Sequence, residues 1–290
     1  MSKKKLAILL ENDMSHCWVC GFRARTLAPL VKKYGSIDQW AEYRENFESA
    51  NSTLMSVPRH NIVALPKDFK LLTVAGSYDP DTRAVRRYAE SRGLSERDMW
   101  YYKLGVSDEP RWKRRLVMPS FDENGSLNFF VGRAIDDRLR PKYDNPDDID
   151  RLPIVFNEIN VDWTSRLVLC EGPFDLVKCG ENATPLLGSE LSEESALFNK
   201  ILINSTPVYV ALDGDTWHHK LPRLVKKLSE YDVDVLVVDV RPWGDPGKMT
   251  RSEFEGALKD AKPMTWGDTF ADKLERATKT NLRIESRAWR

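Results

Sequence analysis

The stretch VYVALDGDTWHHK, residues 208–220, joins an apolar run to two aspartates separated by one glycine. Residues 208–212 predict a short buried strand, because β-branched and aromatic residues in an unbroken apolar run suit a parallel sheet covered on both faces. Asp213 and Asp215 follow the end of that strand, where open α/β sheets bind their ligands. Taken alone, an ordinary strand-to-helix turn explains the stretch equally well, with Gly214 supplying a positive φ angle and an aspartate capping the next helix.

Strands and helices alternate regularly around this stretch. The predicted strands are RLVLC (166–170), ATPLLG (183–188), VYVAL (208–212) and VDVLVVDV (233–240), and the predicted helices are PFDLVKCGE (173–181), SEESALFNKIL (192–202) and HKLPRLVKKLSEY (219–231). This βαβαβαβ order builds right-handed crossovers. It predicts the α/β fold class, with a mostly parallel sheet flanked by helices on both faces.

The sequence before this α/β unit follows a different pattern. Residues 115–135 alternate apolar and polar side chains around DENG, which predicts an antiparallel hairpin. Residues 79–105 predict one or two helices broken at Gly93. We therefore expect a chain that is α+β overall. We expect five segments. These are an N-terminal part (1–50), a linker (51–69), a mixed α+β subdomain (70–165), the α/β unit (166–250) and a charged helical tail (251–290).

The composition is that of a folded chain without net charge. Of the 290 residues, 41% are hydrophobic and 30% are charged, which is enough for one large core or two smaller ones. The 44 basic residues balance the 44 acidic ones, so affinity for nucleic acid must come from local patches. The sequence has neither a signal-peptide core nor a membrane-spanning run, and its four cysteines suit a reducing compartment. We expect a cytoplasmic protein without membrane attachment.

Acidic residues follow several of the predicted strands. Glu171 comes directly after the first strand, with Asp175 one helical turn further on, and Asp245 follows the last strand. Together with Asp213 and Asp215, they are expected at one edge of the sheet. Like charges this close repel unless a cation neutralises them, and carboxylate oxygens suit Mg²⁺ or Mn²⁺. Any one of these acids alone is more simply a helix cap or a solvated loop residue, but capping does not require the whole set.

Two of these motifs, LVLCEGPFD (167–175) and VYVALDGD (208–215), resemble those of the Toprim domain, a magnesium-binding module of primases, topoisomerases and some nucleases. The resemblance implies a catalytic and metal-binding set, Glu171, Asp213 and Asp215, with Asp245 as a further metal ligand. Asp175 matches the aspartate of the family's first motif. Where the family often has a second aspartate two positions after the one matched by Asp245, this chain has Gly247, which suggests weaker binding of one metal.

The flanking sequence favours primase among the Toprim enzymes. The segments YAESRGLS (88–95), RRLVMPSFDENGSLNFFVGRAI (114–135) and RPKYDNP (140–146) resemble those of bacterial-type primases in the family's own order. The motifs EGPFD (171–175) and NFFVGRA (128–134) look closer to phage primases than to host ones. The match implies that Arg92, Arg133 and Lys142 face the groove that holds template and nucleotide, where such groups would bind phosphates.

Two of the basic positions have plainer alternatives. Arg133 closes an apolar strand pattern, so it is also consistent with a surface arginine at a strand end. The run RWKRR, residues 111–115, is as consistent with a solvated basic loop as with a phosphate contact. Trp112 within it would suit stacking on the bases of a single strand.

Cys17 and Cys20 resemble the second half of the zinc ribbon found at the N-terminus of primases. The first half is missing, and a structural zinc site needs four ligands. His16 is badly placed beside Cys17, and His60 is distant in sequence. The resemblance therefore leaves three alternatives open: a vestigial ribbon, a ribbon completed by another chain, or a start that lacks the first half.

The resemblance as a whole implies a phage-like DNA primase in a bacterial or phage-infected cytoplasm. Such an enzyme polymerises ribonucleoside triphosphates on a single-stranded DNA template with Mg²⁺ or Mn²⁺, and a replicative helicase in trans is the expected partner. The charged tail after Met264 would suit that contact, although a solvated helix explains the tail more simply. The alternatives are a Toprim nuclease, which would use the same acids, and a DNA-binding accessory protein without turnover.

Overall fold

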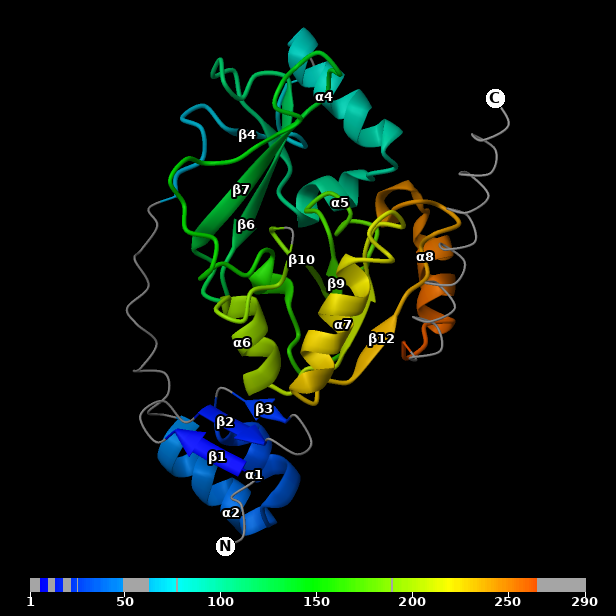
Figure 1. The fold of residues 1–290 in the computed structure, drawn as a ribbon. Helices are drawn as coiled ribbons and strands as arrows, with labels where there is room; N and C mark the ends of the chain where they lie inside the picture. The colour runs from blue at the N-terminus through cyan, green and yellow to red at the C-terminus, as the bar shows by residue number, and fades with distance from the viewer. Residues whose placement is uncertain are drawn as a thin grey trace, which may run out of the picture.

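The computed structural model describes residues 6–9, 14–17, 22–24, 26–48, 63–76, 78–188 and 190–264 (Figure 1). Its strands form a four-stranded parallel sheet, a five-stranded antiparallel sheet and a three-stranded antiparallel sheet. This confirms the mixed α/β architecture expected from the sequence. None of the described helices combines the length and the apolar character needed to span a bilayer.

The parallel sheet has the strand order β10-β9-β11-β12. Its elements, with the helices that follow them, are β9 (Leu167–Cys170), β10 (Ala183–Pro185), α6 (Ala196–Ile203), β11 (Val208–Ala211), α7 (Lys220–Glu230), β12 (Val235–Val237), η3 (Pro246–Lys248) and α8 (Arg251–Lys259). Every neighbouring pair runs parallel, and Val210 of β11 is paired with Leu169 of β9 and with Val237 of β12. The expected parallel sheet is therefore present.

The two faces of this sheet are covered by different parts of the chain. Successive strand residues point to opposite faces. Leu169 and Val210 share one hydrophobic core with side chains of α6 and α7. Val168 and Cys170 share another with side chains of the antiparallel sheet and with Phe254 of α8. Helices α6 and α7 thus cover one face, and α8 covers the other together with the neighbouring subdomain, so the prediction of helices on both faces is correct.

The predicted helix at 173–181 is absent, and the structure has successive turns there. The N–H of Lys178 donates to the carbonyl of Asp175, and the N–H of Cys179 donates to that of Leu176, so the bonds span three residues instead of the four of an α-helix. Gly180 then takes a φ of +95°. β10 and β12 are also shorter than the sequence pattern suggested.

The mixed subdomain carries the antiparallel sheet, in the order β4-β5-β6-β7-β8. Its elements are β4 (Lys70–Leu71), α4 (Pro80–Ser91), α5 (Glu96–Tyr101), β5 (Gly105–Val106), β6 (Arg115–Phe121), β7 (Leu127–Ala134), β8 (Tyr143–Asp144) and the 3₁₀ turn η2 (Glu158–Asn160). The predicted hairpin is β6 and β7, and its turn uses Gly125 at a φ of +80°. The two predicted helices are α4 and α5, which Gly93 separates at a φ of +71°.

The N-terminal module comprises the third sheet and two helices. Its elements are β1 (Leu6–Leu9), β2 (Met14–Cys17), β3 (Arg23–Ala24), α1 (Ala28–Tyr34), α2 (Ile37–Tyr43) and the π-helical turn η1 (Arg44–Glu48). Figure 1 places it beside the ends of α6 and α7, and Lys33 Nζ lies 2.8 Å from the Asp232 carboxylate. Asp232 precedes β12, so the module contacts the edge of the parallel sheet at which the strands begin.

The chain after Thr250 begins as the sequence predicts. The hydroxyl of Thr250 accepts from the N–H of Glu253 and starts α8 with a capping box. Beyond α8, Lys262 pairs with Val237 through two backbone hydrogen bonds, of 2.8 and 3.2 Å, and covers the outer edge of β12. The predicted helical tail beyond residue 264 and most of the predicted linker at 51–69 lie outside the described residues.

Candidate active site at the carboxyl edge of the parallel sheet

The topology brings Glu171 and Asp213 to one edge of the sheet. β9 and β11 are neighbours, with Ala211 opposite Cys170, so the residues after these two strands emerge side by side. The N–H of Gly214 donates to the carbonyl of Gly244 at 2.7 Å, which ties the aspartate loop to the loop that carries Asp245. The predicted convergence of these acids therefore follows from the strand order.

The plain turn explanation of residues 213–215 does not hold. Gly214 is not among the glycines with positive φ. It is needed for close approach, because a Cβ there would lie 3.2 Å from the carbonyl oxygen of Gly244. Neither aspartate caps α7, since the residue before that helix is His219 and it makes no side-chain capping bond. The two carboxylates are thus left for another role.

The acids at this edge repel one another. The pKa of Asp213 is raised to about 7, mainly by burial and then by the negative charges of its neighbours, which are Asp175, Glu171, Asp245 and Asp215. The pKa of Asp175 rises to about 6, through burial and then the charge of Asp245, even though the N–H of Gly172 donates to its carboxylate. Five carboxylates therefore interact electrostatically at this edge, and we call them the acid cluster: Glu171, Asp175, Asp213, Asp215 and Asp245.

Two lysines that sequence reasoning missed partly neutralise the acid cluster. Lys220 Nζ lies 2.5 Å from Oε1 of Glu171, and Lys248 Nζ lies 2.9 Å from Oδ2 of Asp245. Lys248 follows Asp245 by three residues, a spacing that could have suggested the second pair. Nothing in the sequence pairs Lys220 with Glu171, because 49 positions separate them.

Two oxygens of the acid cluster are buried and accept no hydrogen bond among the described residues, namely Oε2 of Glu171 and Oδ1 of Asp213. Such oxygens are costly to bury unless a ligand meets them. Within the described ranges, however, no three His, Cys, Asp or Glu side chains stand close enough to hold a metal ion. The carboxylate oxygens are of the type that binds a hard divalent cation, but the side chains as placed do not form a complete set of metal ligands.

Arg133 and Arg92 border the acid cluster. Their positive charges act to lower the pKa of Asp175. Arg133 is only 8% exposed, so its interpretation as a surface arginine is wrong. Its Nε donates to the Tyr88 hydroxyl at 2.5 Å and its Nη1 donates to the Tyr143 hydroxyl, with the Phe174 ring packed against the guanidinium.

Lys142 lies outside this pocket of aromatic rings. Its side chain is exposed, and Nζ lies 5.8 Å from the centre of the Tyr143 ring. Gly247, by contrast, packs directly against the site: a Cβ there would lie 2.6 Å from Oδ1 of Asp175 and 3.0 Å from Nη2 of Arg92. The position at which an aspartate was expected is thus filled by backbone.

The basic run at 111–115 is structural. Arg114 donates to Asp136 and Asp81, and Arg111 donates to Asp144 at 2.8 and 2.9 Å. Trp112 is buried against Phe130 and is not available for stacking on a base. This run belongs to the fold.

The predicted zinc ligands are only partly within the described residues. Cys17 lies on β2 and is partly buried, while Cys20 lies outside the described residues. Zinc binding by this pair stays a prediction.

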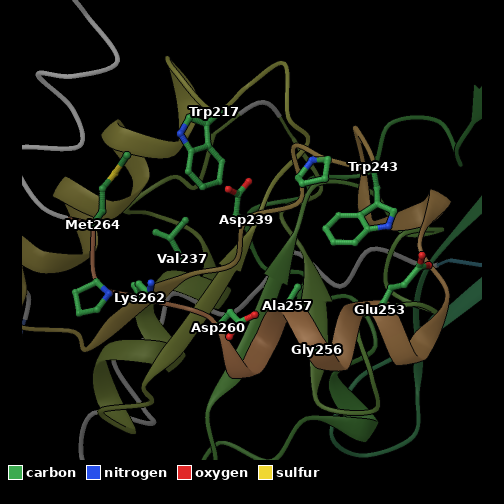
Figure 2. Close-up of a pocket in the computed structure, with 12 residues that line it drawn as sticks. Trp217, Val237, Asp239, Trp243, Glu253, Gly256, Ala257, Asp260, Lys262 and Met264 are labelled. Atoms are coloured by element: carbon green, nitrogen blue, oxygen red, sulfur yellow. The ribbon is translucent and has the colours of Figure 1, made fainter. Parts of the chain in front are cut away.

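A separate cavity of about 820 Å³ lies between β12 and α8 (Figure 2). Trp217, Trp243 and Met264 line it together with Gly256 and Ala257 of α8. None of the five acids lines it, so it is distinct from the acid cluster.

Sequence comparison relates the chain to DNA primases. The DNA primase of Thermotoga maritima is 28% identical over 169 residues, which cover 54% of this chain and 29% of the relative. That of Listeria innocua is 23% identical over 329 residues, covering 88% of this chain and 51% of the relative. The chain therefore spans about half or less of the length of these curated relatives. No protein-family model matches it.

Structure comparison also relates the chain to DNA primases. A DnaG catalytic core is 21% identical and has a TM-score of 0.53, covering 64% of this chain and 75% of that one. The zinc-binding and RNA polymerase domains of the Aquifex aeolicus primase are 18% identical, with a TM-score of 0.50 and coverage of 99% and 81%. At these identities the likeness concerns the fold. In sequence and in fold, the chain is therefore similar to the bacterial-type DNA primases, and its architecture is that of their catalytic core.

Proposed function

We propose that this chain is a DNA primase, a nucleotidyltransferase that joins ribonucleotides into short RNA primers on single-stranded DNA. The observation that carries the proposal is the only partly neutralised acid cluster around Asp213, at the sheet edge where α/β folds bind their ligands. The buried Arg133 and the partly buried Arg92 stand beside it. A site with concentrated negative charge and adjacent phosphate-binding groups suits phosphoryl transfer with a divalent cation.

The acids would hold the cation, with Asp213 and Asp215 as ligands, Glu171 as a ligand or acid/base group and Asp245 as a further ligand. A bound Mg²⁺ or Mn²⁺ supplies charge neutralisation of the phosphates and activation of the attacking hydroxyl. The raised pKa of Asp213 supports this assignment, because it shows that the ionised carboxylate is destabilised unless a positive charge lies nearby.

The arginines would bind the phosphates of nucleotide or template. Arg133 is held by two tyrosine hydroxyls, which orient its guanidinium without neutralising it. Arg92 approaches Asp175 beside Gly247. A pre-oriented guanidinium stabilises the charge of a transferring phosphoryl group with little reorganisation. Lys142, exposed on the rim, would contact the DNA backbone.

The partners are part of the same proposal. One neighbour in fold is described as a primase catalytic domain bound to single-stranded DNA, which supports such a template here. The proposal also includes a replicative helicase acting in trans and a cytoplasmic location. The phage-like character of the motifs stays a prediction.

The test is incorporation of labelled ribonucleotides on mixed single-stranded DNA templates with Mg²⁺ or Mn²⁺. We expect short RNA products from the wild type and a loss of about a hundredfold or more in Asp213→Asn, the scale of losing one preorganised charge. Asp239→Asn is the matched control. Asp239 also follows a strand of this sheet, but Arg241 donates to it at 2.7 and 2.9 Å, so it is already neutralised.

Each of the other outcomes would indicate a different function. Metal-dependent shortening of the template without new RNA would make the chain a nuclease. DNA binding with neither product, with helicase present, would make it an accessory protein. Equal loss in Asp213→Asn and Asp239→Asn would remove the acid cluster from the chemistry.

A further inference from the structure

Lys220 reaches the acid cluster from the first turn of α7. It is the first residue of that helix, and its Nζ donates to Oε1 of Glu171 at 2.5 Å. Both side chains are partly buried, with exposed fractions of 31% and 25%. Oε2 of the same carboxylate is buried and accepts no hydrogen bond among the described residues. The two oxygens of Glu171 thus have different environments.

The backbone holds Lys220 at a set place relative to Asp213. Thr216 anchors the intervening loop, because its N–H and its hydroxyl both donate to the carbonyl of Asp213, at 2.9 and 2.8 Å. The N–H of Lys220 donates in turn to the carbonyl of Thr216 at 3.0 Å. Leu221 then buries the start of α7 in the core. Asp213 and the lysine that contacts Glu171 are therefore joined by one hydrogen-bonded loop.

This arrangement joins the two strands of the site. Glu171 follows β9 and Asp213 follows β11, and the Lys220 ammonium links the first to the loop of the second. A carboxylate bound through one oxygen to an ammonium has less freedom to rotate than a free carboxylate. Its remaining oxygen stays in the buried space of the site.

We propose that Lys220 is a positioning residue that binds Oε1 of Glu171 and so leaves Oε2 as the oxygen that ligates the divalent cation. This inference rests on the proposed function only in that the acid cluster binds such a cation. It predicts that loss of Lys220 weakens cation binding, although it removes a positive charge from the site. An ammonium that merely competed with the cation would give the opposite result.

The experiment measures Mn²⁺ binding to the full chain by electron paramagnetic resonance, without template or nucleotide. We expect Lys220→Met to weaken binding about tenfold, the scale on which partners of metal ligands act, and Lys220→Arg to recover part of the loss. Lys226→Met is the matched control on the same helix, since Lys226 is exposed and lies 3.8 Å from Glu230. It should leave Mn²⁺ affinity unchanged.

Coupling between the two residues sharpens the test. If Lys220 acts through Glu171, the losses of Mn²⁺ affinity in Glu171→Gln and Lys220→Met should not be additive. The double variant should bind Mn²⁺ about as weakly as whichever single variant binds it less tightly. Urea unfolding of each variant checks that it is folded. Unchanged or tighter Mn²⁺ binding by Lys220→Met, additive losses, or a wild type that binds no Mn²⁺ would each overturn the inference.

Primer synthesis separates this inference from the proposed function. A wild type that binds Mn²⁺ through Lys220 and Glu171 but makes no RNA would refute the primase and leave the inference standing. RNA synthesis by a wild type whose Mn²⁺ affinity does not depend on Lys220 would do the reverse.

Discussion

Two charged clusters among the described residues differ in how their acids are paired, and we call the one in which every acid is bonded to a basic side chain the balanced cluster. The balanced cluster consists of Arg111, Lys113 and Arg114 with the acids Asp81, Asp136, Asp144 and Asp147. There, hydrogen bonds from the basic side chains lower the pKa of every acid. In the acid cluster, burial and like charge raise the pKa of Asp213 and Asp175. Charge that the fold leaves uncompensated, and not charge density, marks the candidate site.

The largest effect that would sharpen this contrast comes from Arg133. Arg133→Met removes a buried guanidinium beside the acid cluster and leaves the hydroxyls of Tyr88 and Tyr143 without their donor. We expect primer synthesis to fall about a hundredfold and the free energy of unfolding to fall by about 1 to 3 kcal/mol. Ribonucleotide incorporation and urea unfolding measure the two. Wild-type synthesis by a folded Arg133→Met would show that this arginine serves the fold alone.

A smaller effect is expected at Gly247. Gly247→Ala puts a Cβ within 2.6 Å of Oδ1 of Asp175, so the carboxylate must move. We expect primer synthesis to fall about tenfold or more, because small displacements of reacting groups are expensive, with little change in stability. Gly256→Ala on α8 is the control, since a Cβ there meets nothing within 4 Å. It should raise the free energy of unfolding by up to about 1 kcal/mol and leave synthesis unchanged.

The pH dependence of stability should differ in sign between the clusters. Because the folded pKa of Asp213 is about 7 against an ordinary 3.8, the folded chain binds more protons than the unfolded chain between about pH 4 and 7. This contribution to stability is therefore lost as pH rises through that window. In Asp213→Asn, the decrease in the free energy of unfolding over this pH range should be smaller by on the order of 1 kcal/mol. Urea unfolding at several pH values between 4 and 8 measures it.

The corresponding change in the balanced cluster is Asp136→Asn. The lowered pKa of Asp136 stabilises the fold above its ordinary value of 3.8, and this contribution is lost as pH falls below it. Asp136→Asn should therefore destabilise the chain at neutral pH. If the two variants shift the pH profile in the same direction, the contrast between the clusters is wrong.

The smallest effect is expected from Arg114→Met. Arg114 bonds Asp136 and Asp81, but its side chain is 37% exposed, so solvent screens both pairs. We expect the free energy of unfolding to fall by about 1 kcal/mol or less, with unchanged primer synthesis. Reduced synthesis with normal stability would return this run to the nucleic-acid interface.

The sequence was most informative where structure depends on neighbouring residues. The hairpin of β6 and β7, the break at Gly93 and the strand before Asp213 are confirmed, because alternation, turn residues and apolar runs are local signals. The helix expected at 173–181 is wrong, because its apolar residues suit a buried turn as well as a helix. Short apolar segments do not distinguish the two.

What the sequence by itself determined is the parallel sheet and the identity of the acids at its edge, since residues that follow parallel strands emerge at the same edge whatever their side chains do. Only the tertiary structure decided how those charges are compensated. It paired RWKRR with four acids, buried Arg133 among aromatic rings and brought Lys220 to Glu171. Electrostatic compensation depends on distances between residues far apart in the chain, and no local pattern records those distances.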